Sequence, residues 1–341
     1  MKQNGRHRGL GGIAVQHWRR CTQAAFFLLF ISAPILNIFR LDLELKHFIL
    51  FGWDWTLGLE HFIPGKTPAW QAAQAIFVRA ILPLISLAVA VIFVSWKWGR
   101  IYCGWLCPHF SIVETINRTL RKAIGKQSIW DSDIQPSRNP DGSHTHPDAL
   151  WWFAVLPLSL LCAMLWAVVL LTYLLPPAEI YHNLWHATLT RNQSIFLIVA
   201  SLAFFIEFLL ARHLFCRYAC ALGLFQSLAW MANKKAMVIG FQRHRAKDCA
   251  SCYSACDHVC PMRLQPRSVK RMMFACVQCG QCTDACSQTQ THNPDGKLLD
   301  WVKLAQAESE AALTGKQARV VRIISIISIH HEHTKTAARK T

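Results

Sequence analysis

Residues 149–175 read ALWWFAVLPLSLLCAMLWAVVLLTYLL, a run of 27 residues without a charged side chain. A transmembrane helix needs about 20 consecutive apolar residues, because the bilayer interior offers no water to satisfy the backbone. Three further stretches meet this length: 21–39, 69–96, which Arg79 interrupts, and 194–211, which Glu207 interrupts. The sequence therefore predicts an α-helical polytopic membrane protein with four transmembrane helices.

The composition of the whole chain agrees with a membrane location. Of the 341 residues, 53% are hydrophobic and only 16% are charged, whereas soluble proteins carry roughly 25% charged residues. This balance excludes an ordinary soluble globule, and the apolar content excludes a disordered chain. The 14 cysteines are too many for packing alone, and they point to metal or redox chemistry.

The basic residues predict the orientation. Thirty-one of the 36 Lys and Arg residues lie in segments 1–23, 97–149 and 212–341, and only four lie in loops 40–68 and 176–193. Basic loops stay on the cytoplasmic side, so we expect both termini in the cytoplasm of a bacterial inner membrane. The N-terminus is expected to be a signal anchor. No nucleic-acid motif accompanies the charge, which argues against a nucleic-acid partner. The outer loop 45–63 is expected to lie along the membrane surface.

Eight of the 14 cysteines form two runs of four between residues 249 and 286. A C-x2-C-x2-C loop can supply three thiolates to an iron–sulfur cluster, and in two-cluster ferredoxins the trailing cysteine of each run binds the other cluster. The runs predict a C-terminal two-cluster ferredoxin-like (α+β) cytoplasmic domain. Its two [4Fe-4S] clusters would bind Cys249, Cys252, Cys256 and Cys286 (cluster 1), and Cys276, Cys279, Cys282 and Cys260 (cluster 2).

The first run departs from the ferredoxin spacing at one point. Three residues, 253–255, separate Cys252 from Cys256, where the usual pattern has two. A pair of four-cysteine zinc sites is the structural alternative for the eight thiols. The trailing Cys260-Pro261 pair favours clusters over zinc.

A second cysteine pattern follows two of the predicted spans. Residues 99–110 read GRIYCGWLCPHF and residues 211–222 read ARHLFCRYACAL, so both cysteines of each pair are separated by the same 113 residues. If each C-x3-C is helical, its two thiols share a face. The four thiols would then converge near the inner membrane surface as a redox or metal site, formed by Cys103, Cys107, Cys216 and Cys220. The alternative is plain packing, which we accept for Cys21 and Cys162.

These features divide the chain into six parts: a basic N-terminus (1–23), a first two-helix unit (24–120), a linker (121–148), a second two-helix unit (149–235), the ferredoxin-like domain (236–295) and a tail (296–341). Over about residues 15–290 the chain resembles the membrane-bound 4Fe-4S polyferredoxin family of the NapH, NosR and FixG/RdxA/CcoG oxidase accessory type. The sequence Cys103-Gly-Trp-Leu-Cys107-Pro108, the eight-cysteine domain and segment 40–52 carry the resemblance.

The resemblance implies one of two activities: quinol-linked electron delivery to a reductase, or copper reduction during oxidase maturation. It implies copper or quinone as a further cofactor. As partners it implies a respiratory oxidase or reductase or its assembly factors, together with a quinone or a cytoplasmic electron donor. The chain would thus pass single electrons between its two clusters and the C-x3-C site, as a metal reductase or a quinol dehydrogenase component. A non-catalytic redox-sensing assembly or regulatory protein is the alternative.

Four other residues are candidates for function. Arg79 and Glu207 are ionisable groups inside predicted spans, where burial of charge is costly. His182 and His186 lie four residues apart in an outer loop and, with His47 and His61, could bind a metal or a quinone headgroup. Outward snorkelling of Arg79 and ordinary exposed histidines are the structural alternatives.

Overall fold

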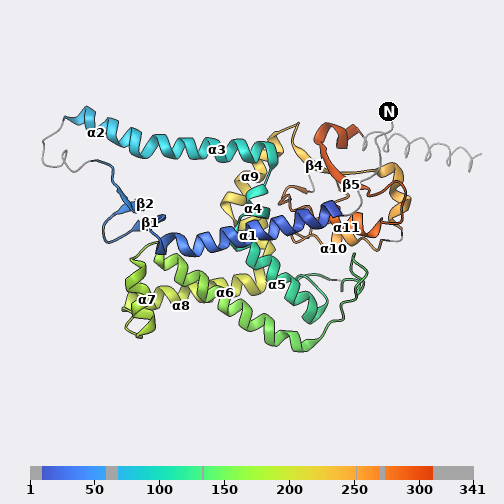
Figure 1. Cartoon of the computed structure of the whole chain (residues 1–341), viewed down its shortest axis with the longest axis horizontal. Helices are drawn as coiled ribbons and strands as arrows, with labels where there is room; N and C mark the ends of the chain where they lie inside the picture. The colour runs from blue at the N-terminus through green and yellow to red at the C-terminus, as the bar shows by residue number, and fades with distance from the viewer. Residues whose placement is uncertain (1–9, 59–67, 133, 251, 269–272, 310–341) are drawn as a thin grey trace, which may run out of the picture.

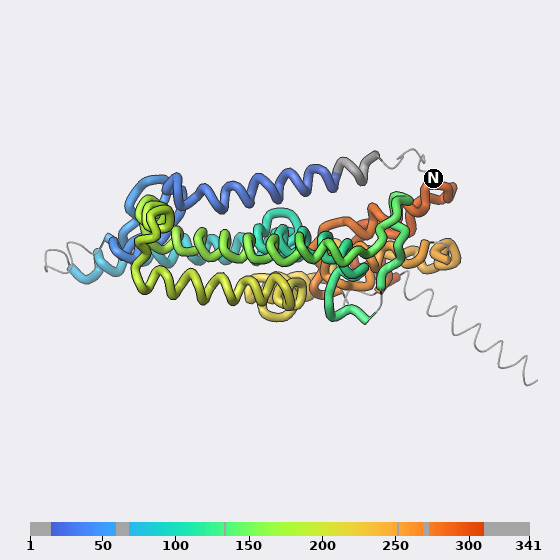
Figure 2. The backbone as a smooth tube through the Cα atoms, turned by 90° about the horizontal axis from the view of Figure 1, so that it is seen from below, coloured from blue at the N-terminus to red at the C-terminus, as the bar shows by residue number. Residues whose placement is uncertain are grey.

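The computed structural model describes residues 10–58, 68–132, 134–250, 252–268 and 273–309. The described chain is elongated, with a small sheet at one end and a ferredoxin-like unit at the other (Figures 1 and 2). Long helices run lengthwise between these ends. Among the described residues, three helices are long and apolar enough to cross a membrane: Ala69–Trp98, Ala149–Thr172 and Arg191–Ala211. They match three of the four predicted spans to within three residues at each end.

Helix α1 (Leu10–Ile35) occupies the place of the first predicted span, but it does not meet the same apolar criterion. It carries the buried polar residues Arg19 and Gln23, which lower its hydropathy. The C-terminal end predicted for this span, at Phe39, is wrong, because the helix ends at Ile35 and Phe39 begins a strand. Helix α1 packs against α5, α4 and α6 and begins at the end that holds the ferredoxin-like unit (Figure 1).

The second lengthwise segment is continuous but contains a π-helical turn. Helix α2 (Ala69–Ile76) passes through η1 (Phe77–Ile81) into α3 (Leu82–Trp98). In the most apolar 18-residue stretch of this segment no residue is buried, whereas 39% of the residues are buried in the corresponding stretch of Ala149–Thr172. Its packing within the chain is mainly that of α3 against α9 (Ala221–Ala232). The apolar surface of this segment is therefore left for lipid.

The third and fourth segments form an antiparallel pair. The short turn η2 (Ala149–Trp151) leads into α6 (Trp152–Thr172), and α7 (Pro177–Trp185) connects it to α8 (Arg191–Ile206) and the π-helical turn η3 (Glu207–Ala211). Thr190 begins α8 with a capping box, in which its hydroxyl accepts from the Gln193 N–H. Helices α6 and α8 make the most extensive helix packing of the molecule.

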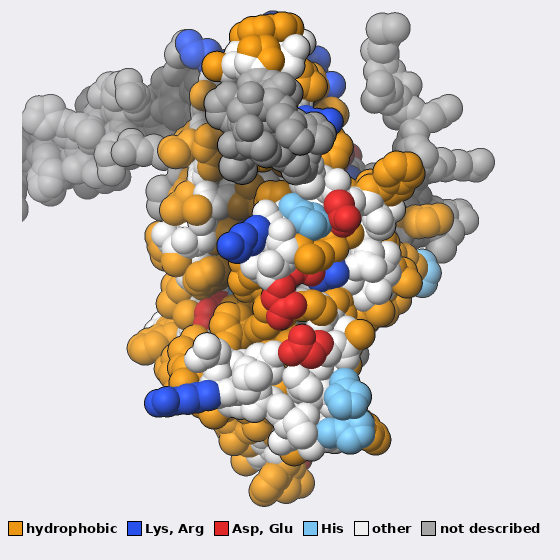
Figure 3. All heavy atoms as spheres, turned by 90° about the vertical axis from the view of Figure 1, so that its left-hand side faces the viewer, with side chains coloured by type: hydrophobic (Ala, Val, Ile, Leu, Met, Phe, Trp, Pro, Cys, Tyr) orange, Lys and Arg blue, Asp and Glu red, His pale blue; other side chains and the backbone are white. Residues whose placement is uncertain are grey.

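The end of the molecule opposite the ferredoxin-like unit, which we call the outer end, contains a structure that the sequence did not predict (Figure 1). Strands β1 (Phe39–Asp42), β2 (His47–Leu50) and β3 (Trp53–Trp55) form an antiparallel sheet in the order β1-β2-β3. Residues 47–55 of the loop 45–63 are thus folded into this sheet, and residues 59–63 lie outside the described chain. Figure 3 shows this end, where hydrophobic side chains surround a few acidic, basic and histidine side chains.

A two-stranded sheet joins the beginning and the end of the ferredoxin-like unit in sequence. Strand β4 (Met237–Phe241) pairs antiparallel with β5 (Leu299–Lys303), from Met237↔Lys303 to Phe241↔Leu299. The turn η5 (Arg243–Cys249), α10 (Ala255–His258) and α11 (Gln281–Thr289) lie between these strands in sequence. Helix α11 also contacts α1. This arrangement holds the eight-cysteine segment against the inner ends of the long helices.

Candidate iron–sulfur and membrane-edge thiol sites

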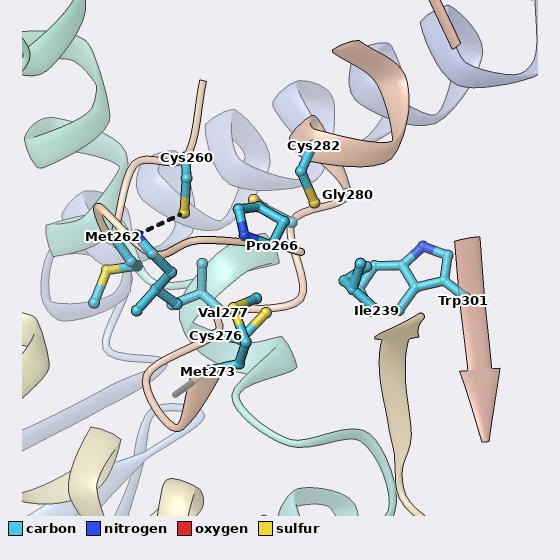
Figure 4. Close-up of a pocket in the computed structure, with 12 residues that line it drawn as sticks. Ile239, Cys260, Met262, Pro266, Met273, Cys276, Val277, Gly280, Cys282 and Trp301 are labelled. Atoms are coloured by element: carbon cyan, nitrogen blue, oxygen red, sulfur yellow. Dashed lines mark hydrogen bonds between the residues drawn. The ribbon is translucent and has the colours of Figure 1, made fainter. Parts of the chain in front are cut away.

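The eight cysteines of the ferredoxin-like unit line two cavities. One, of about 330 Å³, is lined by Cys260, Cys276, Cys279 and Cys282 (Figure 4). The other, of about 270 Å³, is lined by Cys249, Cys252, Cys256 and Cys286. We call them the proximal and the distal cavity, by their place relative to the long helices. The trailing cysteine of each run lies with the other run, so the structure brings together the two sets that the spacing predicts.

The surroundings of the proximal cavity fit an iron–sulfur cluster. Figure 4 shows Cys260, Cys276 and Cys282 reaching toward a common space from separate segments. The Leu264 N–H donates to Cys260 Sγ at 3.4 Å, a contact that favours a thiolate there. Burial raises the pKa of Cys276 and of Cys279 to about 12, so both thiols need a cation to become thiolates. A bound [4Fe-4S] cluster would supply that positive charge and a one-electron redox centre.

The distal cavity has the same kind of donor set. The Leu298 N–H donates to Cys286 Sγ at 3.2 Å. Burial raises the pKa of Cys249 to about 11. In the described chain no three His, Cys, Asp or Glu side chains are close enough to share a single metal ion. The four thiols of each set instead line a cavity in common.

The extra residue in the first run is absorbed by a left-handed bulge. Tyr253 has φ +48° and Ser254 has φ +55°, a conformation that costs a non-glycine residue roughly 1–2 kcal/mol. Arg267 donates to Ser254 Oγ at 3.1 Å and also pairs with Asp257, which stabilises the bulge. Cys256 therefore still lines the distal cavity, while Tyr253 projects outward and is 66% exposed.

The loop that carries Cys276 and Cys279 packs directly on both C-x3-C segments. In the first segment, a Cβ on Gly104 would lie 2.0 Å from the Val277 carbonyl oxygen, and Trp105 Nε1 donates to the Gln278 carbonyl at 3.0 Å. In the second, the Arg217 guanidinium lies 5.4 Å from the ring centroid of Phe274. The proximal cavity is thus the one adjacent to the membrane helices.

The two C-x3-C segments share a backbone arrangement, but neither is one continuous helix. Cys103 lies in α4 (Ile101–Trp105), and Cys107 is the extended residue before α5 (Pro108–Ile124), with ψ 117°. Cys216 lies in the π-helical turn η4 (Phe215–Ala219), and Cys220 precedes α9 with ψ 107°. The prediction of a shared helical face is therefore wrong. In the first copy Pro108 enforces the break, because proline is accepted at the start of a helix and not inside one.

Three of the four membrane-edge thiols lie in or against the apolar cluster that contains Cys279 of the proximal cavity. Cys103 and Cys216 are buried in the same apolar cluster as Cys279, and Cys107 packs against that cluster. Cys103 Sγ donates to Gln226 Oε1 at 3.4 Å. Burial raises the pKa of Cys107 to about 12. All four are free thiols, so dithiol chemistry and soft-metal binding are both open to them.

Glu207 has a partner that the sequence analysis missed. Its Oε1 lies 3.2 Å from His109 Nε2, and both side chains are largely buried. The His109 ring lies among Trp166, Phe208 and Phe215. The only sequence signal was the position of His109, two residues after Cys107. The pair adds an ionisable group beside the membrane-edge thiols.

The other candidate residues lie at the outer end. Arg79 in η1 reaches outward, where its guanidinium donates to the Thr56 carbonyl at 3.5 Å. His182 and His186 stack on each other with centroids 4.2 Å apart. His47 contacts Asp54 at 3.0 Å, and His61 lies outside the described residues. The structure therefore gives Arg79 a structural contact and gathers no described histidines into a three-ligand site.

A buried ion pair joins the membrane part to the ferredoxin-like unit. Arg19 of α1 donates two hydrogen bonds to Glu114 of α5, at 2.7 and 2.9 Å. Gln281, the first residue of α11, donates to Glu114 Oε1 at 2.6 Å. Side chains from α1 and α11, which are distant in sequence, therefore meet at one carboxylate of α5, a contact that no local motif predicts.

Comparison with known proteins agrees with this architecture. A family model described as a 4Fe-4S binding domain matches residues 80–127 and 193–237, which are the two copies of the C-x3-C unit. Ferredoxin-type protein NapH of Haemophilus influenzae is 22% identical, over 80% of this chain and 86% of its own. No solved structure matches the chain. The protein is thus a ferredoxin-type electron-transfer protein with apolar helices suited to membrane anchoring.

Two further relatives have a similar sequence identity to this chain. Protein RdxA of Cereibacter sphaeroides is 26% identical over 69% of this chain and 50% of its own. Putative electron transport protein YccM of Escherichia coli is 22% identical, over 67% and 57%. The chain is similar to these 4Fe-4S ferredoxin-type proteins over two thirds or more of its length. Identities of 22–26% favour no single subgroup.

Proposed function

We propose that this protein passes single electrons between two [4Fe-4S] clusters, one in each cavity, and the membrane-edge thiols. In this proposal the chain crosses the bacterial inner membrane four times, and its termini and clusters lie on the cytoplasmic side. The described helices are consistent with this path, since α1 begins at the same end of the molecule as the ferredoxin-like unit (Figure 1).

The observation that carries the proposal is the packing of the 273–279 loop on both C-x3-C segments. Cys279 belongs to the same apolar cluster as Cys103 and Cys216. Cys282, which lines the proximal cavity, also belongs to the cluster that contains Cys256 and Cys286 of the distal cavity. The contacts therefore support an order of distal cluster, proximal cluster and membrane-edge thiols, without an intervening layer of solvent.

We propose copper or a quinone as the redox partner of the membrane-edge thiols, and a respiratory oxidase or reductase as the system served. Paired thiols bind soft metals and also undergo reversible two-electron oxidation. The buried His109–Glu207 pair lies near these thiols, because His109 follows Cys107 by two residues and its ring contacts Trp166 of α6 and Phe215 of η4. This placement supports a site that is reached from the bilayer.

The membrane-edge site can be tested by a quadruple Cys→Ser variant at positions 103, 107, 216 and 220. We expect the variant to keep about eight iron atoms per chain and to lose re-oxidation by Cu(II) or by quinone after dithionite reduction. The measurement is anaerobic stopped-flow absorbance of the cluster bands, with Cys162→Ser as the matched control. Unchanged re-oxidation of the quadruple variant would exclude the site. A wild-type protein that neither oxidant re-oxidises would favour a regulatory or assembly role.

The assignment of ligands to cavities predicts independent loss of each cluster. We expect Cys276→Ser to remove the proximal cluster and Cys249→Ser to remove the distal one, so that iron falls from about eight to about four atoms per chain in each. The electron paramagnetic resonance spectra of the two reduced variants should be different and should together account for the wild-type signal. Zinc in place of iron in the anaerobically purified protein would contradict both assignments.

A further inference from the structure

A polar groove lies beside the distal cavity. Its lining includes Arg121, Arg138, Cys252, Tyr253, His258 and His292. We call it the distal groove. One wall comes from the 121–148 linker, and the other comes from the segments around α10 and the end of α11. Sequence analysis gave this linker no role beyond connection.

Specific contacts hold the two walls together. The side-chain amides of Gln127 and Gln135 both donate to the His258 carbonyl, at 2.7 and 3.2 Å. Arg263 Nε donates to Asp131 Oδ1 at 3.0 Å. The linker is thus fixed on the ferredoxin-like unit, so the groove exists before any ligand binds.

The groove carries an excess of positive charge. Asp141 is the only acidic residue in its lining, against Arg121 and Arg138. An adjoining hollow, which shares Arg121 and Asp141, adds Arg20 and Arg118 together with Glu114 and Asp284. Glu114 is already paired with Arg19, and Arg118 lies 3.8 Å from the same carboxylate, so the remaining excess comes from Arg20, Arg121 and Arg138 against Asp141 and Asp284. The combined surface is therefore suited to a negatively charged partner.

The groove also adjoins the distal cavity directly. Cys252 lines both the distal cavity and the groove. Beside it Tyr253 stands 66% exposed on the left-handed bulge. The extra residue of the first run therefore presents an aromatic side chain next to a cluster ligand and near several arginines. Tyrosine and arginine are the residue types that most often anchor protein interfaces.

We propose that the distal groove docks an acidic one-electron carrier protein of the ferredoxin or flavodoxin class. This inference rests on the proposed function, because it needs a cluster in the distal cavity. In the step, the reduced carrier loses one electron and the oxidised cluster gains it, and no proton or bond is transferred. A nicotinamide donor is less suited, since it delivers two electrons as hydride and the cluster accepts one. Small, charge-steered interfaces are typical of such electron-transfer pairs.

Binding can be measured separately from electron transfer. The probe is a gallium-substituted acidic plant-type ferredoxin, which cannot be reduced, titrated onto the cluster-loaded protein in nanodiscs. We expect binding that weakens with salt, and a loss of affinity of about tenfold in Arg138→Glu and in Tyr253→Ala at low salt. Lys303→Glu, an exposed charge reversal on β5, is the control and should bind as the wild type does.

Kinetics then separate the two proposals. With native reduced ferredoxin, we expect Arg138→Glu to slow cluster reduction about tenfold, whereas photoreduced deazaflavin should reduce the wild type and the variant equally. Equal binding and equal ferredoxin rates in wild type, Arg138→Glu and Tyr253→Ala would overturn the docking site and leave the proposed function intact. A wild-type protein that deazaflavin cannot reduce would overturn the proposed function itself.

Discussion

Gly104→Ala is expected to destabilise the protein by about 3 kcal/mol and to loosen the ferredoxin-like unit from the membrane helices. In an exposed helix the same change would stabilise by up to about 1 kcal/mol, because alanine is the better helix former. Here the new Cβ would lie 2.0 Å from the backbone oxygen of Val277. A backbone atom cannot rotate away, so either α4 or the 273–279 loop must shift.

The effect can be measured by thermal unfolding of the cluster-loaded protein, followed by loss of cluster absorbance. Gly142→Ala is a useful control, since nothing lies within 4 Å of its Cβ position and only its left-handed φ of +84° is strained. Truncating the neighbouring side chain, as in Gly104→Ala/Val277→Ala, should not restore stability, because the obstacle is the main chain. A stabilised Gly104→Ala protein would show that this interface is absent.

Glu114→Ala is expected to cost about 3–5 kcal/mol, because it leaves the buried Arg19 without its counter-charge. The two side chains are 6% and 1% exposed, so water cannot replace the lost carboxylate. Gln281 and Gln23 would lose an acceptor at the same time. The loss should be visible as a lower midpoint in chemical denaturation and as release of the ferredoxin-like unit to limited proteolysis.

The double variant Arg19→Met/Glu114→Leu should recover most of this loss, because it removes both charges and fills the space with apolar atoms. Glu44→Gln, at an exposed position of the outer end, is the matched control. A Glu114→Ala protein as stable as the wild type would contradict the ion pair.

The charge of Glu114 also makes the stability of the protein depend on pH. Burial acts to raise the pKa of Glu114, but the hydrogen bonds and charge of Arg19 outweigh it and lower the pKa below 4.5. The stability from this group is therefore present above pH 4.5 and lost as the pH falls through the folded-state pKa.

The long helices could be predicted because apolar length is a local property of the sequence. Helix α1 was the least regular case, since its polar residues Arg19 and Gln23 face the partner helix α5 and weaken the apolar signal. The outer sheet was missed because its strands have only three or four residues each. The aromatic side chains of Phe48 and Trp53 suggested a membrane surface as readily as a strand.

The two thiol sets could be predicted from spacing, because the crossing of trailing cysteines follows from the ferredoxin pattern. The geometry of the C-x3-C pairs could not, since in the first copy α4 ends at Trp105, between the two thiols, and Pro108 starts the next helix directly after Cys107. His109 and the distal groove depend on contacts between segments about 100 or more residues apart, such as His109 with Glu207. Those contacts carry no periodic or motif signal.

The β4–β5 ladder has a consequence for the order in which this protein is made. All eight cluster cysteines lie between its two strands in sequence, and the ladder pairs Met237 with Lys303. The long helices that the structure describes all precede Cys286, the last cysteine of the chain, and the ladder can close only after residue 303 is synthesised. Under the proposed function, iron loading is therefore a late event, on helices that are already made, and truncation just before β5 would leave the ferredoxin-like unit open.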